Sequence, residues 1–272
     1  MSQQQTINEK TLRDRFNPEG SLLRRHQQRM LEMLRAFDTI CQRHHIPYWL
    51  SSGTLLGCVR HGGFIPWDDD LDVEMLREDY LRLQPFLLRE LPDHLALQTH
   101  QTDPGYFFCY PKLRDRRSHL EELSGYDWAF GLQGAYIDIF LLESSPACLQ
   151  TLSQLTIGHC YAIMKDRHLS PAQKRKRVGR WFRANQTFVF PVLRLLSRLS
   201  SRRWLRHTFG TPYPAPRQRS DIFPLAERTF EGHAFPVPRD NHAYLQRMFG
   251  DYMKLPNLDR LQVHTAKLKL DE

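Results

Sequence analysis

The sequence predicts a mixed α/β fold, in which a body of helices and strands is followed by a helical extension. Three observations support this prediction. Apolar residues recur every three to four positions over residues 22–45, as in an amphipathic helix. Runs of β-branched and aromatic residues, such as 136–142, are typical of strands. After about residue 146 the pattern becomes helical again, with a loop rich in proline beyond it.

The elements of this body follow one another in order. Pro47 ends the first helix, and residues 48–50 suit a short buried strand. A turn at 51–54 opens a second helix, which Gly62 and Gly63 end. We then expect a strand over 65–75, a helix over 77–91, strands over 95–99, 106–113 and 136–142, turns within 222–240, and a last helix over 241–248.

Length and composition exclude several classes of protein. The chain has 272 residues, of which 41% are hydrophobic and 11% aromatic, enough for a sizeable core rather than a disordered chain. No stretch approaches the ~20 apolar residues of a membrane span, and the polar start lacks the apolar middle of a secretory signal. The five cysteines are scattered without metal-site spacing, so we expect reduced thiols. These features predict a cytoplasmic protein.

The net charge of +8 is concentrated in one segment. Residues 167–220 contain 14 Lys or Arg and no acidic residue, so the remainder of the chain carries a net charge of −6. Within this segment Arg194, Arg198 and Arg202 recur every four residues beside several leucines, which predicts a cationic stripe on an amphipathic helix. Such a segment fits peripheral contact with an anionic membrane, a solvated face that covers the acidic body, or a nucleic-acid patch.

The acidic run at 68–72 is the strongest chemical signal. If these residues form a strand, Asp68, Asp70 and Asp72 share one face, while Leu71 and Val73 face the core. Three neighbouring carboxylates repel one another unless a cation lies between them. Because the available ligands are all oxygen atoms, the run predicts a Mg²⁺ or Mn²⁺ site rather than zinc. The alternative is a solvated acidic turn.

Two further features accompany the acidic run. Asp138 lies among β-branched and aromatic residues, where an unpaired carboxylate is costly, so we expect a role for it as metal ligand or general base. The turn Ser52-Gly53-Thr54 opens a helix, whose free N–H groups can bind a phosphate. This order of a glycine turn, an Asp-x-Asp strand and one further Asp is the layout of the nucleotidyltransferase superfamily.

The run from 52 to 72, SGTLLGCVRHGGFIPWDDDLD, resembles the signature of the LicD family, which includes bacterial cholinephosphotransferases and has fukutin-related ribitol-phosphate transferases as relatives. The resemblance continues through 77–80 and 137–140, and resumes at 230–232 and 249–253. It implies a nucleotidyltransferase-like core at 47–145, between an N-terminal helical segment at 1–46 and a basic extension with the C-terminal family motif at 146–272. For the 249–253 motif we expect a helix end with packed aromatic rings, with Asp251 in the site as a secondary alternative.

The resemblance also implies an activity. Family members take an alcohol phosphate from a CDP-linked donor, release CMP and place the phosphate on a sugar hydroxyl of a surface glycan. We therefore expect a metal-dependent phosphotransferase that uses a CDP-alcohol, with phosphocholine as the first choice and a glycan or lipid-linked glycan as acceptor. It would work in the cytoplasm, with membrane contact at the inner face. The rival hypotheses are a nucleotidyltransferase that uses an NTP, and a basic nucleic-acid-binding protein, which the acidic run disfavours because carboxylates repel phosphates.

The roles of individual residues follow from the same resemblance. Asp70 and Asp72 would hold the metal, Asp68 would assist, and Asp138 would complete the shell or accept the proton of the acceptor. Ser52, Gly53 and Thr54 would contact the donor phosphates. Arg60 and Lys112 are candidates for the charge on the transferred phosphate, with surface ion pairs as the alternative. Trp67 and Tyr48 fit either stacking on cytosine or the core.

Overall fold

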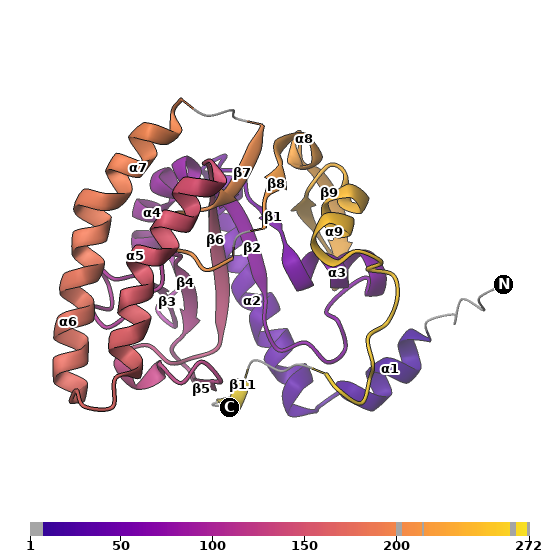
Figure 1. Ribbon diagram of the computed structural model, residues 1–272. Helices are drawn as coiled ribbons and strands as arrows, with labels where there is room; N and C mark the ends of the chain where they lie inside the picture. The colour runs from indigo at the N-terminus through magenta and orange to yellow at the C-terminus, as the bar shows by residue number, and fades with distance from the viewer. Residues whose placement is uncertain (1–7, 200–202, 214, 262–264, 271–272) are drawn as a thin grey trace.

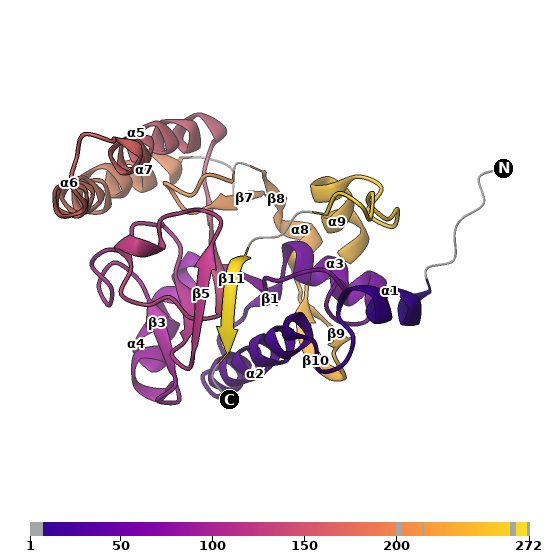
Figure 2. The same cartoon turned by 90° about the horizontal axis from the view of Figure 1, so that it is seen from below.

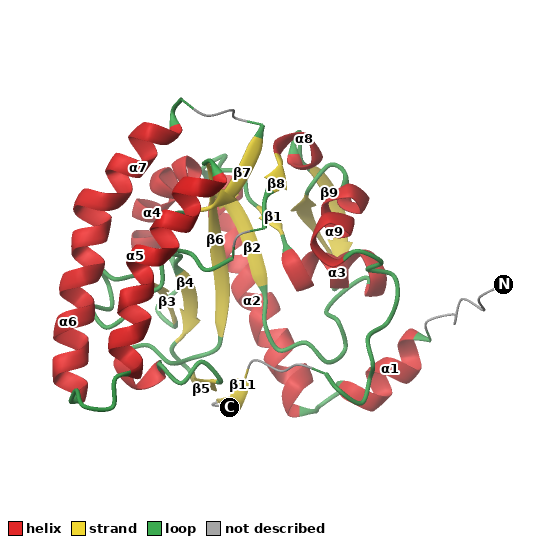
Figure 3. Cartoon of the chain, viewed as in Figure 1, coloured by secondary structure: helices red, strands yellow, loops and turns green. Residues whose placement is uncertain are grey.

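A computed structural model describes residues 8–199, 203–213, 215–261 and 265–270 of the chain (Figures 1 and 3). It has the mixed α/β fold that the sequence predicts, with a curled sheet between two layers of helices. The main sheet has seven strands: β1 (Trp49–Leu50), β2 (Asp72–Leu76), β3 (Leu95–Gln98), β4 (Lys112–Asp115), β6 (Tyr136–Ser144), β7 (Trp204–His207) and β8 (Arg217–Gln218).

Strand β6 is the centre of this sheet. The path runs β1-β2-β6-β4-β3, and β7 pairs with the far end of β6 and with β8. Strands β2 and β6 are parallel, with Asp72 in register with Asp138. On its other side β6 is antiparallel to β4, which places Lys112 opposite Asp138. The sheet thereby brings together three residues that lie far apart in the sequence.

Helices cover both faces of the sheet (Figure 2). On one face lie α2 (Leu22–Arg43) and α4 (Arg77–Glu90), close to the lengths predicted from their apolar spacing. On the other face lies a helical layer made of α5 (Ala147–Lys165), α6 (Pro171–Ala184), a π-helical turn η2 (Asn185–Val189) and α7 (Phe190–Ser197). None of the helices in the described ranges is both long and apolar enough to cross a bilayer.

The smaller elements lie beside β1 and around a second, two-stranded pair. The β1 edge is flanked by α3 (Ser52–His61), α9 (Asn241–Phe249) and the hairpin β9–β10. A separate pair, β5 (Ser118–Glu122) and β11 (Thr265–Leu270), brings the end of the chain beside the middle of it. The remaining elements are α1 (Glu9–Phe16), η1 (Asp127–Ala129), α8 (Arg219–Ile222), β9 (Ala226–Phe230) and β10 (His233–Val237).

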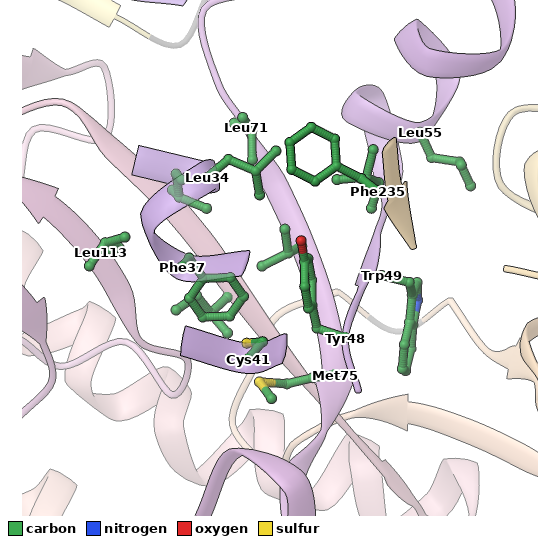
Figure 4. Packing of buried hydrophobic residues seen from close by; sticks show 14 of the residues in the cluster. Leu34, Phe37, Cys41, Tyr48, Trp49, Leu55, Leu71, Met75, Leu113 and Phe235 are labelled. Atoms are coloured by element: carbon green, nitrogen blue, oxygen red, sulfur yellow. The ribbon is translucent and has the colours of Figure 1, made fainter. Parts of the chain in front are cut away.

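Two apolar clusters hold these layers together. In the larger one the stripe of α2, including Leu34, Phe37 and Cys41, packs on β2 and the loop before β1 (Figure 4). Tyr48 is a core residue here, since it is buried and its hydroxyl donates to Asp38 at 2.8 Å. The smaller cluster joins the helical layer to the loop before β4, for example through Phe107.

A buried polar group lies within the larger cluster. The Glu74 carboxylate of β2 accepts hydrogen bonds from Arg217 Nη2 at 2.8 Å, Tyr244 Oη at 2.7 Å and Trp49 Nε1 at 3.0 Å. Burial alone would raise the pKa of Glu74, but the Arg217 guanidinium, together with His207 and the Tyr244 hydroxyl, holds it at about 2. Through these hydrogen bonds Glu74 links β2 to β1, β8 and α9, in addition to the apolar packing.

The predicted strand over 65–75 is wrong for its first seven residues, because β2 begins only at Asp72. Residues 65–71 form a loop. Three of its carbonyl groups bond to α2, and only the last, that of Leu71, accepts a hydrogen bond from a neighbouring strand, from the Asp138 N–H of β6 at 2.9 Å. Gln27 Nε2 donates to the carbonyl oxygens of Ile65 at 3.3 Å and Asp68 at 2.9 Å. His26 Nε2 lies 3.0 Å from the carbonyl oxygen of Asp69.

Two other differences concern strands. The predicted strand over 106–113 begins only at Lys112, since Pro111 has no N–H to donate and the aromatic residues before it pack as a loop in the smaller cluster. Of the turns expected over 222–240, the one at Gly232 is confirmed as the turn of hairpin β9–β10, whereas Pro236 lies within β10. The turn residues Glu231 and Gly232 both have positive φ, the geometry of a tight hairpin turn.

Candidate functional site

A cavity of about 1450 Å³ lies beside β2, β4 and β6. Its wall contains the four predicted carboxylates, Asp68, Asp70, Asp72 and Asp138. Five other predicted residues line the same cavity: Ser52, Gly53, Arg60, Trp67 and Lys112. The structure therefore gathers nearly all of the predicted site residues around one space.

Backbone contacts set the positions of these carboxylates. Asp72 begins β2, and its N–H donates to the hydroxyl oxygen of Thr54 at 2.8 Å. Through this bond the buried Thr54 positions Asp72. Its contact with a donor phosphate stays a prediction. Asp68 Oδ2 would lie 2.9 Å from a Cβ at Gly53, so a side chain at this position would displace the Asp68 carboxylate. Asp69 turns away, because its Oδ2 accepts a hydrogen bond from the Thr265 N–H at 2.7 Å.

Burial and mutual repulsion raise the pKa values of the carboxyl groups in this cluster. Desolvation, then the charges of Asp70 and its neighbours, raises the pKa of both Asp68 and Asp72 well above the usual range. Desolvation also raises the pKa of Asp138 to about 6, although the Lys112 ammonium opposes the shift. A carboxyl group with this pKa can exchange a proton near neutral pH, as a general base must.

We expect Asp138→Asn to gain stability relative to the wild type as the pH rises from about 4 through 6, in buffer with EDTA. In that window folded Asp138 keeps a proton that the unfolded chain has released, so the wild type loses stability with rising pH. Two pKa units correspond to about 3 kcal/mol. Urea unfolding of both proteins at several pH values measures the difference. Asp251→Asn, at an exposed residue of the cavity wall, is the control, and its free energy of unfolding should vary with pH as in the wild type. A difference between Asp138→Asn and the wild type that does not change with pH would contradict the assignment.

Lys112 lies at the floor of the cavity between two carboxylates. Its Nζ is 3.1 Å from Asp138 Oδ1 and 3.2 Å from Glu122 Oε2, and 3.4 Å from the centre of the Tyr136 ring. Arg114 is also buried, and its Nη2 lies 2.6 Å from Glu122 Oε1. Burial would raise the pKa of Glu122, but Lys112 and Arg114 hold it below its usual value. The predicted alternative of a surface ion pair is wrong for Lys112, since its pairs are buried.

The carboxylate cluster matches the donor chemistry of a hard divalent cation. Asp68, Asp70 and Asp72 supply only oxygen ligands, and their raised pKa values show that a positive charge would be favourable among them. Over the described ranges, no three His, Cys, Asp or Glu side chains already stand in the arrangement of a metal shell. A Mg²⁺ or Mn²⁺ ion therefore stays a prediction that fits the residues present.

Arg60 joins the C-terminal motif to the cavity. Its Nη1 donates to the carbonyl oxygen of Tyr252 at 2.8 Å, and its Nε lies 2.8 Å from His61 Nε2. The motif ends α9 with Gly250 at positive φ and packs Tyr252 in the core, as expected. Asp251 also lines the cavity, so the motif contributes to its wall as well.

The two remaining donor-site candidates lie at the opening of α3 and on the acidic loop. Ser52 has a φ of 48°, a left-handed conformation that turns the chain sharply from β1 into α3. Trp67 packs edge-on against Phe16, with ring centres 5.3 Å apart, and its other surface lines the cavity. Its position fits both of the predicted alternatives.

The sequence analysis did not find the aromatic wall of this cavity. Phe108 stacks on Tyr110 with ring centres 5.6 Å apart, and Tyr110 contacts Phe140 at 4.6 Å. The rings of this wall come from five separate segments: Phe108, Tyr110, Tyr126, Tyr136, Phe140, Tyr161 and Tyr213. Only the run of aromatic residues at 106–110 is visible as a local signal, because the other rings meet through the fold.

Comparisons with known proteins show what this chain is similar to. The sequence model of the family described as LicD/FKTN/FKRP, nucleotidyltransferase domain, matches residues 45–187. The lipopolysaccharide cholinephosphotransferase LicD of Haemophilus influenzae is 28% identical over 257 residues, which cover 86% of this chain and 92% of that protein. Shorter matches include the human ribitol 5-phosphate transferase FKRP, 53% identical over 12% of this chain and 7% of that protein. The mannosyltransferase regulator 4 of Saccharomyces cerevisiae is 40% identical over 18% of this chain and 4% of that protein.

Proposed function

Because the chain belongs to the LicD/FKTN/FKRP nucleotidyltransferase-domain family, we propose that it is a phosphotransferase acting on a glycan of the lipopolysaccharide kind. In this proposal it moves an alcohol phosphate, phosphocholine in the first instance, from a CDP-alcohol to a sugar hydroxyl and releases CMP. The observation that carries the proposal is the cluster of four carboxylates in the wall of one cavity. Transfer of a phosphoryl group depends mainly on positioning and charge neutralisation, which such a cluster can organise.

Each polar residue of the cavity has a role in this proposal. Asp70 and Asp72, assisted by Asp68, would hold a Mg²⁺ or Mn²⁺ ion, which when bound supplies positive charge to the donor diphosphate. Asp138 would complete that shell or accept the proton of the acceptor hydroxyl, for which its pKa of about 6 is suited. Lys112 keeps Asp138 in place and offsets part of the negative charge. Arg60 and the start of α3 at Ser52 and Gly53 would contact the donor phosphates.

The aromatic wall supports choline as the alcohol. A quaternary ammonium group is attracted to the faces of aromatic rings, and it needs no hydrogen-bond acceptor. Ribitol and glycerol carry several hydroxyl groups, which need hydrogen-bond partners that the faces of aromatic rings do not supply. The relative with the widest coverage of the three is itself described as a cholinephosphotransferase.

Thermal unfolding with candidate donors tests this function. CDP-choline, CDP-ribitol, CDP-glycerol and CTP are each added to the wild type and to Asp70→Asn, with and without MgCl₂. We expect CDP-choline with Mg²⁺ to raise the Tm of the wild type most. At a concentration of 100 Kd the gain is about 2.7 kcal/mol, or several degrees for a chain of this length. Asp70→Asn should lose the part of the shift that depends on Mg²⁺.

Other outcomes separate the rival functions. A shift with CTP alone would favour the nucleotidyltransferase that uses an NTP. No shift with any nucleotide, together with RNA or DNA binding that weakens steeply with salt and is unaffected by Asp70→Asn, would favour the nucleic-acid-binding protein. A shift with another CDP-alcohol would retain the reaction and replace choline.

A further inference from the structure

The outer face of α7 carries an apolar stripe that no part of the described chain covers. Val192 and Leu195 lie on α7, Phe188 lies on the π-helical turn η2 before it, and Leu199 lies just after its end. Their spacings of four, three and four residues are typical of one side of a helix. Their exposed fractions are 70%, 56%, 60% and 91%. The opposite side of α7 is buried, since Phe190 and Leu193 pack in the smaller apolar cluster. A contiguous exposed stripe of this kind marks an interaction surface.

Cationic side chains flank this apolar stripe. Arg180 and Arg183 are exposed on the last two turns of α6, before η2, and Arg198 is exposed at the end of α7. The structure pairs none of these three with an acidic side chain in the described ranges. The sequence contains no Asp or Glu between residues 167 and 220 that could balance them.

This surface differs from the one that the sequence predicts. The predicted cationic stripe included Arg194, but Arg194 faces inward, where its Nε donates to Glu143 Oε2 at 2.8 Å. Arg202, its third member, lies outside the described residues. The solvent side of α7 is therefore apolar, and the free cations lie at its two ends.

We propose that the apolar stripe of α7 inserts into the surface of an anionic lipid bilayer, with Arg180, Arg183 and Arg198 against the lipid headgroups. Leucine and phenylalanine side chains gain by entering the boundary between headgroups and acyl chains, and nearby cations gain from anionic lipid. The charges disfavour the other occupants. A second copy of the chain would bring an identical set of cations against these, and a nucleic acid would leave the apolar stripe exposed to water.

This binding mode bears on the proposed reaction without depending on it. The helical layer that carries the stripe also supplies Tyr161 of α5 to the aromatic wall of the cavity. A bilayer held by α7 would thus lie beside the layer that borders the cavity, and a lipid-linked acceptor would be concentrated there.

Co-sedimentation with vesicles tests the proposal. The full chain is mixed with vesicles of phosphatidylcholine alone, or with about 30% phosphatidylglycerol, at low and high NaCl. We expect binding to the anionic vesicles at low salt and weaker binding at high salt. Phe188→Ser combined with Leu195→Ser should lower the partition coefficient at least about tenfold. Arg180→Gln combined with Arg183→Gln should lower it about fivefold for each cation removed.

Two controls keep the result specific. Leu81→Ser combined with Leu88→Ser removes leucines of 48% and 56% exposure from α4, on the other face of the sheet, and should bind vesicles like the wild type. Asp70→Asn should also bind like the wild type, so that loss of catalysis and loss of membrane binding are separate results. The proposal fails if the wild type does not bind anionic vesicles at low salt, or if the α4 variant loses as much binding as the α7 variant. It also fails if the α7 substitutions convert a dimer to a monomer without any effect on lipid.

Discussion

Replacing Asp72 by Asn is expected to lower the transferase activity by about 10³-fold, the upper range for loss of one preorganised electrostatic group. Asp72 lies at the start of β2, in register with Asp138, and it lines the cavity with Asp68 and Asp70. Asparagine keeps its shape but removes the charge that the proposed metal needs. Release of CMP from the CDP-alcohol with a lipopolysaccharide acceptor measures the loss.

The same substitution should raise the Tm of the metal-free protein. Burial and the neighbouring carboxylates raise the pKa of Asp72, so near neutral pH the folded chain either buries an unfavourable charge or takes up a proton that the unfolded chain releases. The neutral amide carries neither cost. Asp69→Asn is the matched control, because that residue lies in the loop just before Asp72 but bonds to the Thr265 N–H. We expect it to retain activity. An Asp72→Asn variant that is fully active, or one that is inactive only because it unfolds, would contradict the assignment.

Arg217→Met is expected to lower the free energy of unfolding by about 3–5 kcal/mol, since it leaves the Glu74 charge buried without its cation. Arg217 bonds to Glu74 through both Nε and Nη2, at 3.1 and 2.8 Å. Urea unfolding at neutral pH measures the loss. The double variant Glu74→Gln with Arg217→Met should recover part of it, because no charge is then buried alone.

A surface ion pair provides the comparison. Arg247 lies 2.8 Å from Asp221, with 42% of its side chain exposed, so Arg247→Met should cost no more than about 1 kcal/mol. Equal losses for Arg217→Met and Arg247→Met would show that burial of the Glu74 pair is unimportant. Such a result would also remove the explanation for the low pKa of Glu74.

The sequence predicts the helices on the sheet well, because their apolar spacing is local. It also predicts that the side chains of Asp68, Asp70 and Asp72 lie together. The reason given, that alternate residues of a strand share one face, applies only to Asp72, which begins β2. Asp68 and Asp70 reach the cavity from a loop that is held against α2. The hydrogen bond from Gln27 to the Asp68 carbonyl oxygen that holds it there joins residues 41 positions apart. No periodicity in the acidic run reports that contact.

The rest of the site depends on long-range pairing that a single sequence does not display. Glu122 has no local signal that predicts a role in the site, but the structure buries it at the cavity, where it pairs with Lys112 and Arg114. Arg194 belongs by spacing to an outward stripe, and Glu143 turns it inward. The domain limits at 46 and 145 stay a prediction, while β7, from beyond the second limit, completes the same sheet.

The position of Asp138 on the central strand limits how the gene can vary. Side chains alternate along a strand, so one codon inserted in β6 ahead of Asp138 would exchange the two faces for the residues after it. Asp138 would then turn into the apolar core, and Ile139 would turn toward the cavity. Insertions and deletions that selection tolerates should therefore fall in the connecting loops, while substitutions alone should change this strand.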